Sequence, residues 1–172
     1  MPRSEPKIRR ARLGDLDALC ALENFFPSDR LGRAHVRHLL KHGHADIWVC
    51  EENGELIGNA VVLYRRGALS ARMYSLVVHA GHQRRGIALR LMQTAEAAAR
   101  AHGGSAMRLE VRPDNISAIK LYQKAGYHAT GTAKNFYEDG SAALKMRKAL
   151  TDELAKSAVL SSNTLSLRER AG

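Results

Sequence analysis

The chain has 172 residues and a formal net charge of +10, from 27 Lys and Arg against 17 Asp and Glu. Its 45% hydrophobic and 26% charged residues are typical of one folded, water-soluble domain and argue against wholesale disorder. Apolar runs are only a few residues long, and residues 1–12 are basic without an apolar core. We therefore expect a cytoplasmic protein with no membrane partner and no secretory signal.

The first third of the chain predicts a strand and two helices. A short edge strand over residues 7–11 precedes Asp15, which can cap a helix whose apolar residues follow at spacings of three and four. Ser28 or Asp29 can cap a second helix, which ends at Gly43. Cys20 and Cys50 are too far apart for a zinc ligand set, so we expect both to be core residues and no metal.

The spacing of apolar residues then changes to the alternation that is typical of strands. Further along the chain, strand and helix patterns follow one another. Asn53-Gly54 is typical of a tight hairpin turn between two strands. We expect strands over residues 47–50, 56–64, 72–78, 106–111, 127–130 and 142–146, and helices over residues 84–101 and 115–124. The predicted order is βααβββαβαββ, an α/β fold with a mixed sheet and helices on both faces. Residues 1–150 would form the domain and residues 151–172 a frayed or disordered tail.

The strongest local motif is the run Gln83-Arg84-Arg85-Gly86-Ile87-Ala88, which follows a buried strand and opens a helix. The first N–H groups of a helix lack internal partners and attract anions. Gly86 allows close approach of a phosphate, and the arginines offer forked donors. By itself the run also suits a glycine near a helix start beside solvated arginines. Its spacing fits neither the dinucleotide fingerprint nor the P-loop.

A second group of residues lies downstream. Glu110 stands in the otherwise apolar strand Leu109–Val111, where it is either desolvated, as a general base requires, or turned outward to a surface Arg. Asn115 is either a plain helix cap or a ligand contact. Tyr122 is either a core aromatic residue or a proton donor.

Together these runs resemble the GNAT superfamily of acetyl-CoA-dependent N-acetyltransferases, and most of all its RimI-like members, which acetylate the N-terminal amine of a ribosomal protein. The resemblance covers residues 7–150. It rests on Leu76-Val77-Val78, on the run from Gln83 to Ala88, on Leu109-Glu110-Val111-Arg112, on Asn115 with Ala118, Leu121-Tyr122 and Gly126-Tyr127, and on the closing hairpin from Tyr137-Glu138-Asp139-Gly140 to Ala143-Leu144-Lys145-Met146.

The resemblance implies a splayed central sheet and a role for each motif residue. Glu110 would be the general base and Tyr122 the general acid. The splay between the strands near Val78 and Glu110 would admit the pantetheine arm. The residues implied to bind acetyl-CoA are Leu76, Val77, Val78, Gln83, Arg84, Arg85, Gly86, Ile87, Ala88, Leu89 and Asn115.

The expected reaction is direct attack of a primary amine on the thioester. An α-amine has a pKa near 7.7–8.0, against about 10.4 for a Lys side chain, so it needs little help at neutral pH. We expect a protein N-terminus as the acceptor, with a ribosomal protein as the first candidate. A small-molecule amine or a Lys side chain is the alternative. A non-catalytic basic module that binds the ribosome or nucleic acid is an alternative of another class, although we do not expect nucleic acid as a direct ligand.

Overall fold

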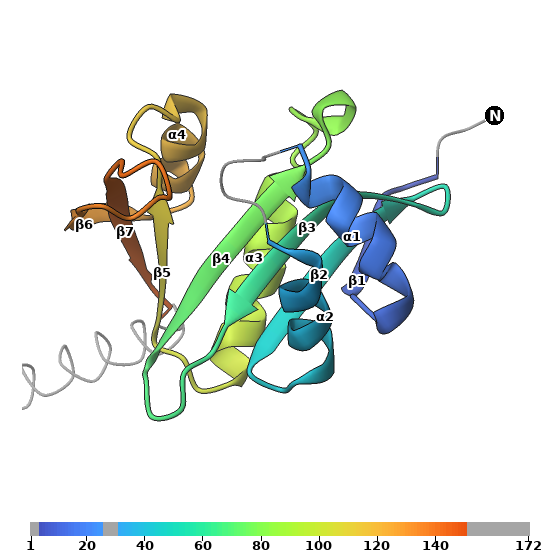
Figure 1. Cartoon of the computed structure of the whole chain (residues 1–172), viewed down its shortest axis with the longest axis horizontal. Helices are drawn as coiled ribbons and strands as arrows, with labels where there is room; N and C mark the ends of the chain where they lie inside the picture. The colour runs from blue at the N-terminus through green and yellow to red at the C-terminus, as the bar shows by residue number, and fades with distance from the viewer. Residues whose placement is uncertain (1–3, 26–30, 151–172) are drawn as a thin grey trace, which may run out of the picture.

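The computed structural model describes residues 4–25 and 31–150, and within these ranges the chain forms one mixed sheet with helices on both faces (Figure 1). The elements are β1 (Lys7–Arg10), α1 (Leu16–Glu23), α2 (Arg33–Lys41), β2 (Ala45–Glu52), β3 (Glu55–Leu63), β4 (Ser70–Val78), α3 (Ile87–Ala101), β5 (Ala106–Val111), α4 (Ile116–Lys124), β6 (His128–Ala133) and β7 (Ala143–Ala149). The predicted fold class and element order are confirmed. The predicted cap at Ser28 or Asp29 and the tail over residues 151–172 lie outside the described residues.

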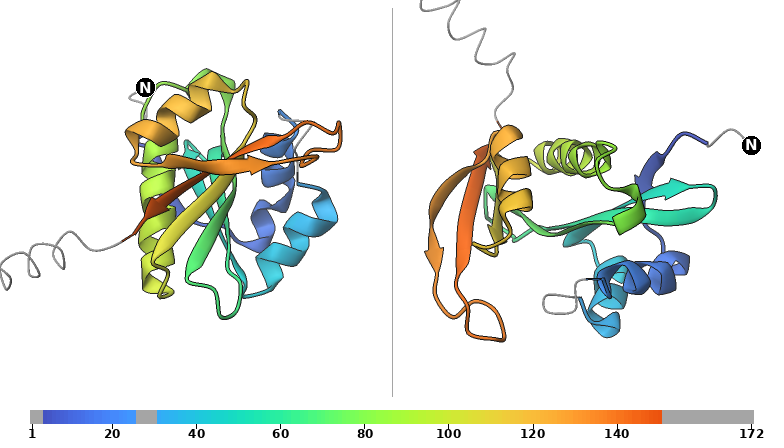
Figure 2. Two further views of the ribbon diagram at one scale, coloured as in Figure 1. Left: turned by 90° about the vertical axis from the view of Figure 1, so that its left-hand side faces the viewer. Right: turned by 90° about the horizontal axis from the view of Figure 1, so that it is seen from above.

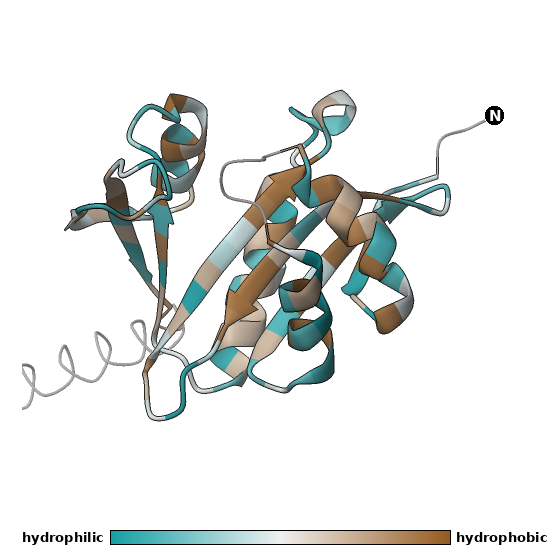
Figure 3. Cartoon of the chain, in the orientation of Figure 1, coloured by the Kyte–Doolittle hydropathy of each residue, from teal (hydrophilic) through white to brown (hydrophobic). Residues whose placement is uncertain are grey.

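The sheet has the strand order β1-β2-β3-β4-β5-β7-β6, and α1 and α2 cover the face opposite α3 and α4 (Figure 2). The larger core lies under α3, where Leu91, Met92 and Ala95 are fully buried against the strands. The smaller core lies under α1 and α2 and includes Leu19 and Val36. Hydropathy follows this division, since β3 is strongly apolar whereas α2 is largely polar on its outer side (Figure 3). The helices therefore cover the sheet by burying an apolar stripe.

The sheet opens between β4 and β5, the one parallel pair. Register pairs join Ser70–Arg72 to Ala106–Arg108 and go no further, while β4 stays paired with β3 along the rest of its length. Figure 1 shows the two strands diverging from that shared base. Beyond Arg72, the β5 side of β4 therefore has no strand partner, and this is the splay that the resemblance implied.

Three local features differ from the predictions. Helix α3 begins at Ile87 and not at Arg84, because Arg84 (φ 61°) and Gly86 (φ 73°) take the left-handed conformation that interrupts a helix. Asp15 stands at the start of α1, but its carboxylate accepts hydrogen bonds from Arg9 and from the backbone N–H of Arg12 and none from α1. The closing strands β6 and β7 each run three residues further than predicted.

Candidate active site

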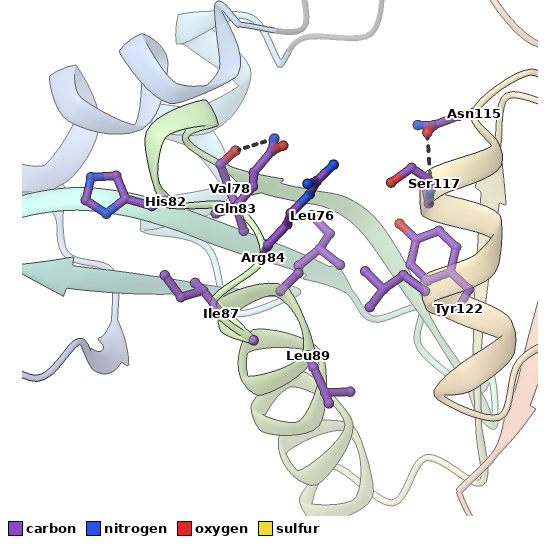
Figure 4. Close-up of a pocket in the computed structure, with 14 residues that line it drawn as sticks. Leu76, Val78, His82, Gln83, Arg84, Ile87, Leu89, Asn115, Ser117 and Tyr122 are labelled. Atoms are coloured by element: carbon purple, nitrogen blue, oxygen red, sulfur yellow. Dashed lines mark hydrogen bonds between the residues drawn. The ribbon is translucent and has the colours of Figure 1, made fainter.

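A pocket of about 370 Å³ lies between the open edge of β4, the start of α3 and helix α4 (Figure 4). Nine of the residues predicted to bind the cofactor line it: Leu76, Val78, Gln83, Arg84, Gly86, Ile87, Ala88, Leu89 and Asn115. His82, Ser117, Ala118, Leu121 and Tyr122 complete the lining. The fold thus brings two sequence motifs, separated along the chain by a helix and a strand, to opposite walls of one pocket.

The turn before α3 is shaped to receive an anion. Gly86 is the N-cap of α3, and its carbonyl accepts the first helical hydrogen bond, from the N–H of Arg90 at 3.0 Å. The N–H groups of the first turn have no partner inside the helix, and the helix dipole adds partial positive charge there. Gln83 fixes the other end of the turn, since its side-chain amide donates to the carbonyl of Val78 at 3.3 Å. This wall of the pocket therefore suits a diphosphate.

Arg85 does not line this pocket, because a carboxylate from another strand holds it. Glu52, at the end of β2, accepts bonds from both terminal nitrogens of Arg85, at 2.7 and 3.0 Å. The His82 ring packs into the same cluster, 3.3 Å from Glu52 and 2.8 Å from Arg85. The Glu52 side chain is only 4% exposed. Sequence reasoning missed Glu52, since nothing in its strand signals that the turn, 33 positions away, folds against it.

Helix α4 supplies the opposite wall. Asn115 caps it, with the side-chain oxygen accepting from the N–H of Ala118 at 3.2 Å. Tyr122 follows about two turns later and projects into the pocket (Figure 4). Burial raises the pKa of Tyr122 to about 12, so its phenol is protonated at neutral pH. Its hydroxyl makes no hydrogen bond to any residue that the structure describes, and so it is available as a donor.

A second pocket, of about 460 Å³, opens on the α1 and α2 face of the splay. It shares Leu76, Asn115, Ala118 and Tyr122 with the first pocket, so the two meet where β4 and β5 have parted. The remaining lining residues are Glu23, Arg72, Tyr74, Ser75, Val77, Glu110, Val111, Arg112, Phe136, Tyr137 and Glu138. Val77, which was predicted to bind the cofactor, lies on this side. A ligand in each pocket would approach the other beside Tyr122.

Glu110 lines the second pocket and combines the two alternatives left open by the sequence. Its side chain is 11% exposed, yet one oxygen accepts from Arg72 at 2.9 Å and the other from Arg108 at 3.3 Å. The carboxylate is therefore both within the pocket and paired with arginine.

Glu23 is a second carboxylate in this pocket, and sequence reasoning missed it. It is 2% exposed, and within the described residues it accepts bonds only from neutral groups, the hydroxyl of Ser75 at 2.8 Å and the amide of Asn59 at 3.0 Å. No Lys, Arg or His of the described ranges pairs with it. Burying a carboxylate without a cation is costly, so Glu23 is suited to receive a positively charged ligand group. A Glu at the end of an apolar helix stripe gives no such signal in the sequence.

Metal ligation and membrane spanning were two further possibilities for the described residues. Residues 4–25 and 31–150 contain no group of three or more His, Cys, Asp or Glu that could hold a metal ion. None of their helices has the length and apolar character needed to cross a membrane. Cys20 and Cys50 are unbonded thiols and line neither pocket.

Comparisons with known proteins agree with this arrangement. Residues 16–127 match the model of the acetyltransferase (GNAT) family. The chain is 29% identical over 154 residues to an N-alpha-acetyltransferase of Sulfurisphaera tokodaii, covering 83% of this chain and 92% of the relative. It is 26% identical over 138 residues to a putative bS18-alanine N-acetyltransferase of Bacillus subtilis, covering 80% and 90%. The crystal structure of Ard1 from Thermoplasma volcanium has the same fold, with a TM-score of 0.79, 24% identity and coverage of 87% and 100%.

Proposed function

Because the chain belongs to the GNAT family of acetyltransferases, we propose that it acetylates the N-terminal α-amine of a protein, with a ribosomal protein as the first candidate and the cytoplasm as its location. Its family and its relatives make it an N-acetyltransferase that uses acetyl-CoA as co-substrate. The alternative of a non-catalytic binding module is therefore set aside.

The observation that carries the proposal is the meeting of two pockets at Tyr122. The first fits acetyl-CoA, since it joins an anion-binding turn to an open strand edge along which a pantetheine arm can lie. Bound there, the co-substrate supplies an acetyl thioester. The second pocket is lined by carboxylates and aromatic residues, which suit an ammonium group and a short stretch of polypeptide.

The proposal assigns one role to each of three residues. Glu23 receives the acceptor ammonium, because it is the buried carboxylate of the second pocket that has no cation of its own among the described residues. Glu110 is the general base and takes the proton of the amine, directly or through a water molecule. Tyr122 is the general acid and donates its phenolic proton to the departing thiolate.

The arrangement favours an α-amine over a Lys side chain. Both oxygens of Glu110 already accept guanidinium hydrogen bonds, from Arg72 and Arg108. A base engaged in this way suits an amine that is already partly unprotonated at neutral pH. An α-amine, with a pKa near 7.7–8.0, meets that condition, whereas a Lys ammonium near 10.4 does not.

The experiment that tests the proposal measures release of the CoA thiol with a panel of acceptors: peptides with free Ala or Ser N-termini, the same peptides with a blocked N-terminus and an internal Lys, polyamines and aminoglycosides. We expect turnover with the free N-termini alone. Turnover confined to a polyamine or an aminoglycoside would replace the protein acceptor by a small molecule. Activity on the blocked peptides would point to Lys.

A further inference from the structure

The open face of the C-terminal half of the sheet carries a row of basic side chains that starts inside the second pocket. Register pairs place Arg72 of β4 beside Arg108 of β5, Arg108 beside Arg147 of β7, and Arg147 beside His128 of β6. Residues paired across neighbouring strands point to the same side of a sheet. The four side chains therefore form one line across four strands.

This line lies on the face opposite the core. Leu109 and Met146, which alternate with its members, are buried under the helices. The Arg108 side chain is 47% exposed, and Arg147 and Lys145 are exposed as well. No acidic residue of the described chain forms a salt bridge or a side-chain hydrogen bond with Arg147 or Lys145.

The charge balance on this surface is positive. Glu110 is the acidic residue in the next row, beside Lys145, and it is shared between Arg72 and Arg108. Three arginines and one lysine against one carboxylate give a surplus of three charges. We use the name basic row for the three arginines of this line, Arg72, Arg108 and Arg147, together with Lys145 of the next row.

We propose that the basic row binds acidic side chains of the acceptor polypeptide, a few residues after the N-terminus that is acetylated. The inference rests on the proposed function and names the acceptor class more narrowly. Arg72 belongs to the row and also lines the second pocket, so the two surfaces are continuous.

The direction of the chain follows from the order of charges. The carboxylates Glu23 and Glu110 stand at the pocket end, where an ammonium group would lie, and the unpaired cations stand beyond it. A chain with a positive end followed by negative side chains is complementary to this order. RNA is not, because its phosphates would meet both carboxylates in the same groove.

Strand geometry gives the expected positions. Leu76, where the two pockets meet, lies four residues from Arg72 on β4, and this is about 13 Å at roughly 3.3 Å per residue. Arg147 lies two strands further, about 10 Å at roughly 4.8 Å per strand. An extended peptide covers these distances in about four and about seven residues. The acidic side chains are therefore expected at positions five to eight of the acceptor.

The test compares two ten-residue acceptors that share their first four residues. One carries Asp and Glu at positions five to eight, and the other carries Asn and Gln. For the natural chain we expect KM for the acidic peptide to be at least about fivefold lower at low ionic strength, with the difference lost in about 0.5 M salt. Equal KM values for the two peptides would overturn the proposal.

Two double variants with the same change in net charge test whether the preference for the acidic peptide depends on the basic row or on overall charge. The double substitution Lys145→Glu and Arg147→Glu should abolish or reverse the preference. Lys7→Glu with Lys41→Glu makes the same charge change on β1 and α2, elements that do not line the second pocket, and should preserve the preference. Loss of the preference in both double variants would overturn the row as its cause.

A four-residue acceptor distinguishes the two proposals. It ends before the row, so its KM should be the same for the natural chain and for the Lys145→Glu, Arg147→Glu variant, whereas kcat is not compared because Lys145 lies beside the general base Glu110. Failure of every peptide would contradict the proposed function itself. Salt-sensitive binding of a fluorescent single-stranded RNA that disappears in the variant, without any peptide preference, would overturn the inference in favour of RNA.

Discussion

Glu52 and Arg85 form a bidentate ion pair, at 2.7 and 3.0 Å, that joins the end of β2 to the middle of the turn before α3. Arg85 lies between two residues in the left-handed conformation, Arg84 and Gly86. Glu52 also raises the pKa of Arg85, so the guanidinium is held charged in this contact. The pair therefore fixes the shape of a turn whose backbone N–H groups must be aimed before the diphosphate arrives.

We expect Glu52→Gln to weaken acetyl-CoA binding while chemistry persists. An amide cannot hold Arg85 with two charge-assisted bonds, so the turn loses its anchor. The expected change is a rise in KM for acetyl-CoA of about tenfold, with kcat within about twofold. Acetyl-pantetheine, which has no diphosphate, should show an unchanged KM. Glu55→Gln, an exposed change at the start of β3, is the control. Equal KM values for acetyl-CoA in the two variants would contradict the role of Glu52 as the anchor of the turn.

Gly86→Glu should abolish measurable acetyl-CoA binding. The added carboxylate would stand at the N-terminus of α3, where the phosphates are expected, and Gly86 has a positive φ that other residues adopt at a cost of about 1–2 kcal/mol. Gly86→Ala carries the backbone cost without the charge and should bind acetyl-CoA with intermediate affinity. Calorimetry measures both. Undiminished affinity in the glutamate variant would place the phosphates elsewhere.

Tyr122→Phe should lower kcat by about one hundredfold and leave acetyl-CoA binding and thermal stability nearly unchanged, since the Tyr122 hydroxyl has no hydrogen-bond partner in the described chain to lose. Tyr127→Phe is the matched control. It removes a bond of 3.0 Å to the buried Glu96 and should cost about 1.5–3 kcal/mol of stability without the loss in kcat. If Tyr122→Phe lowered stability and left kcat unchanged, Tyr122 would be a packing residue and not the general acid.

The pH dependence gives an independent check on Tyr122. Burial raises its pKa to about 12, so the phenol stays protonated and able to donate well above the ordinary value of 10. The rate should therefore show no alkaline decline from this group up to about pH 10.5, within the range where the fold is stable. A decline that begins near pH 9 and is absent in Tyr122→Phe would contradict the raised pKa.

The two carboxylates of the second pocket should differ in their kinetic signatures. Glu110→Gln is expected to lower kcat, most strongly at low pH where the acceptor amine is protonated. Glu23→Gln is expected to raise KM for the acceptor about tenfold and to change kcat less, because it removes the charge that receives the ammonium. Glu138→Gln, an exposed change at the rim, is the control. A flat pH–rate profile for Glu110→Gln would remove Glu110 as the base.

The sequence by itself determined the order of the elements and the position of the turn that we propose as the phosphate site, because both depend on local order. Apolar periodicity placed each helix and strand in its order, and a glycine turn before a helix forms an anion site from its own backbone. The run from Gln83 to Leu89 therefore predicts the anion-binding turn directly from its residues, apart from the three residues by which α3 starts later.

Tertiary structure alone decided which groups face one another. The sequence predicts Arg85 as a phosphate ligand. In the fold, Glu52 of β2 binds the guanidinium of Arg85, and Arg85 does not line the first pocket. Glu23 becomes a pocket carboxylate because α1 packs across β3 and β4, which supply Asn59 and Ser75. The basic row exists through strand register, which sets side by side residues that are far apart in the chain. Contacts of this kind depend on packing between elements, and local periodicity carries no information about them.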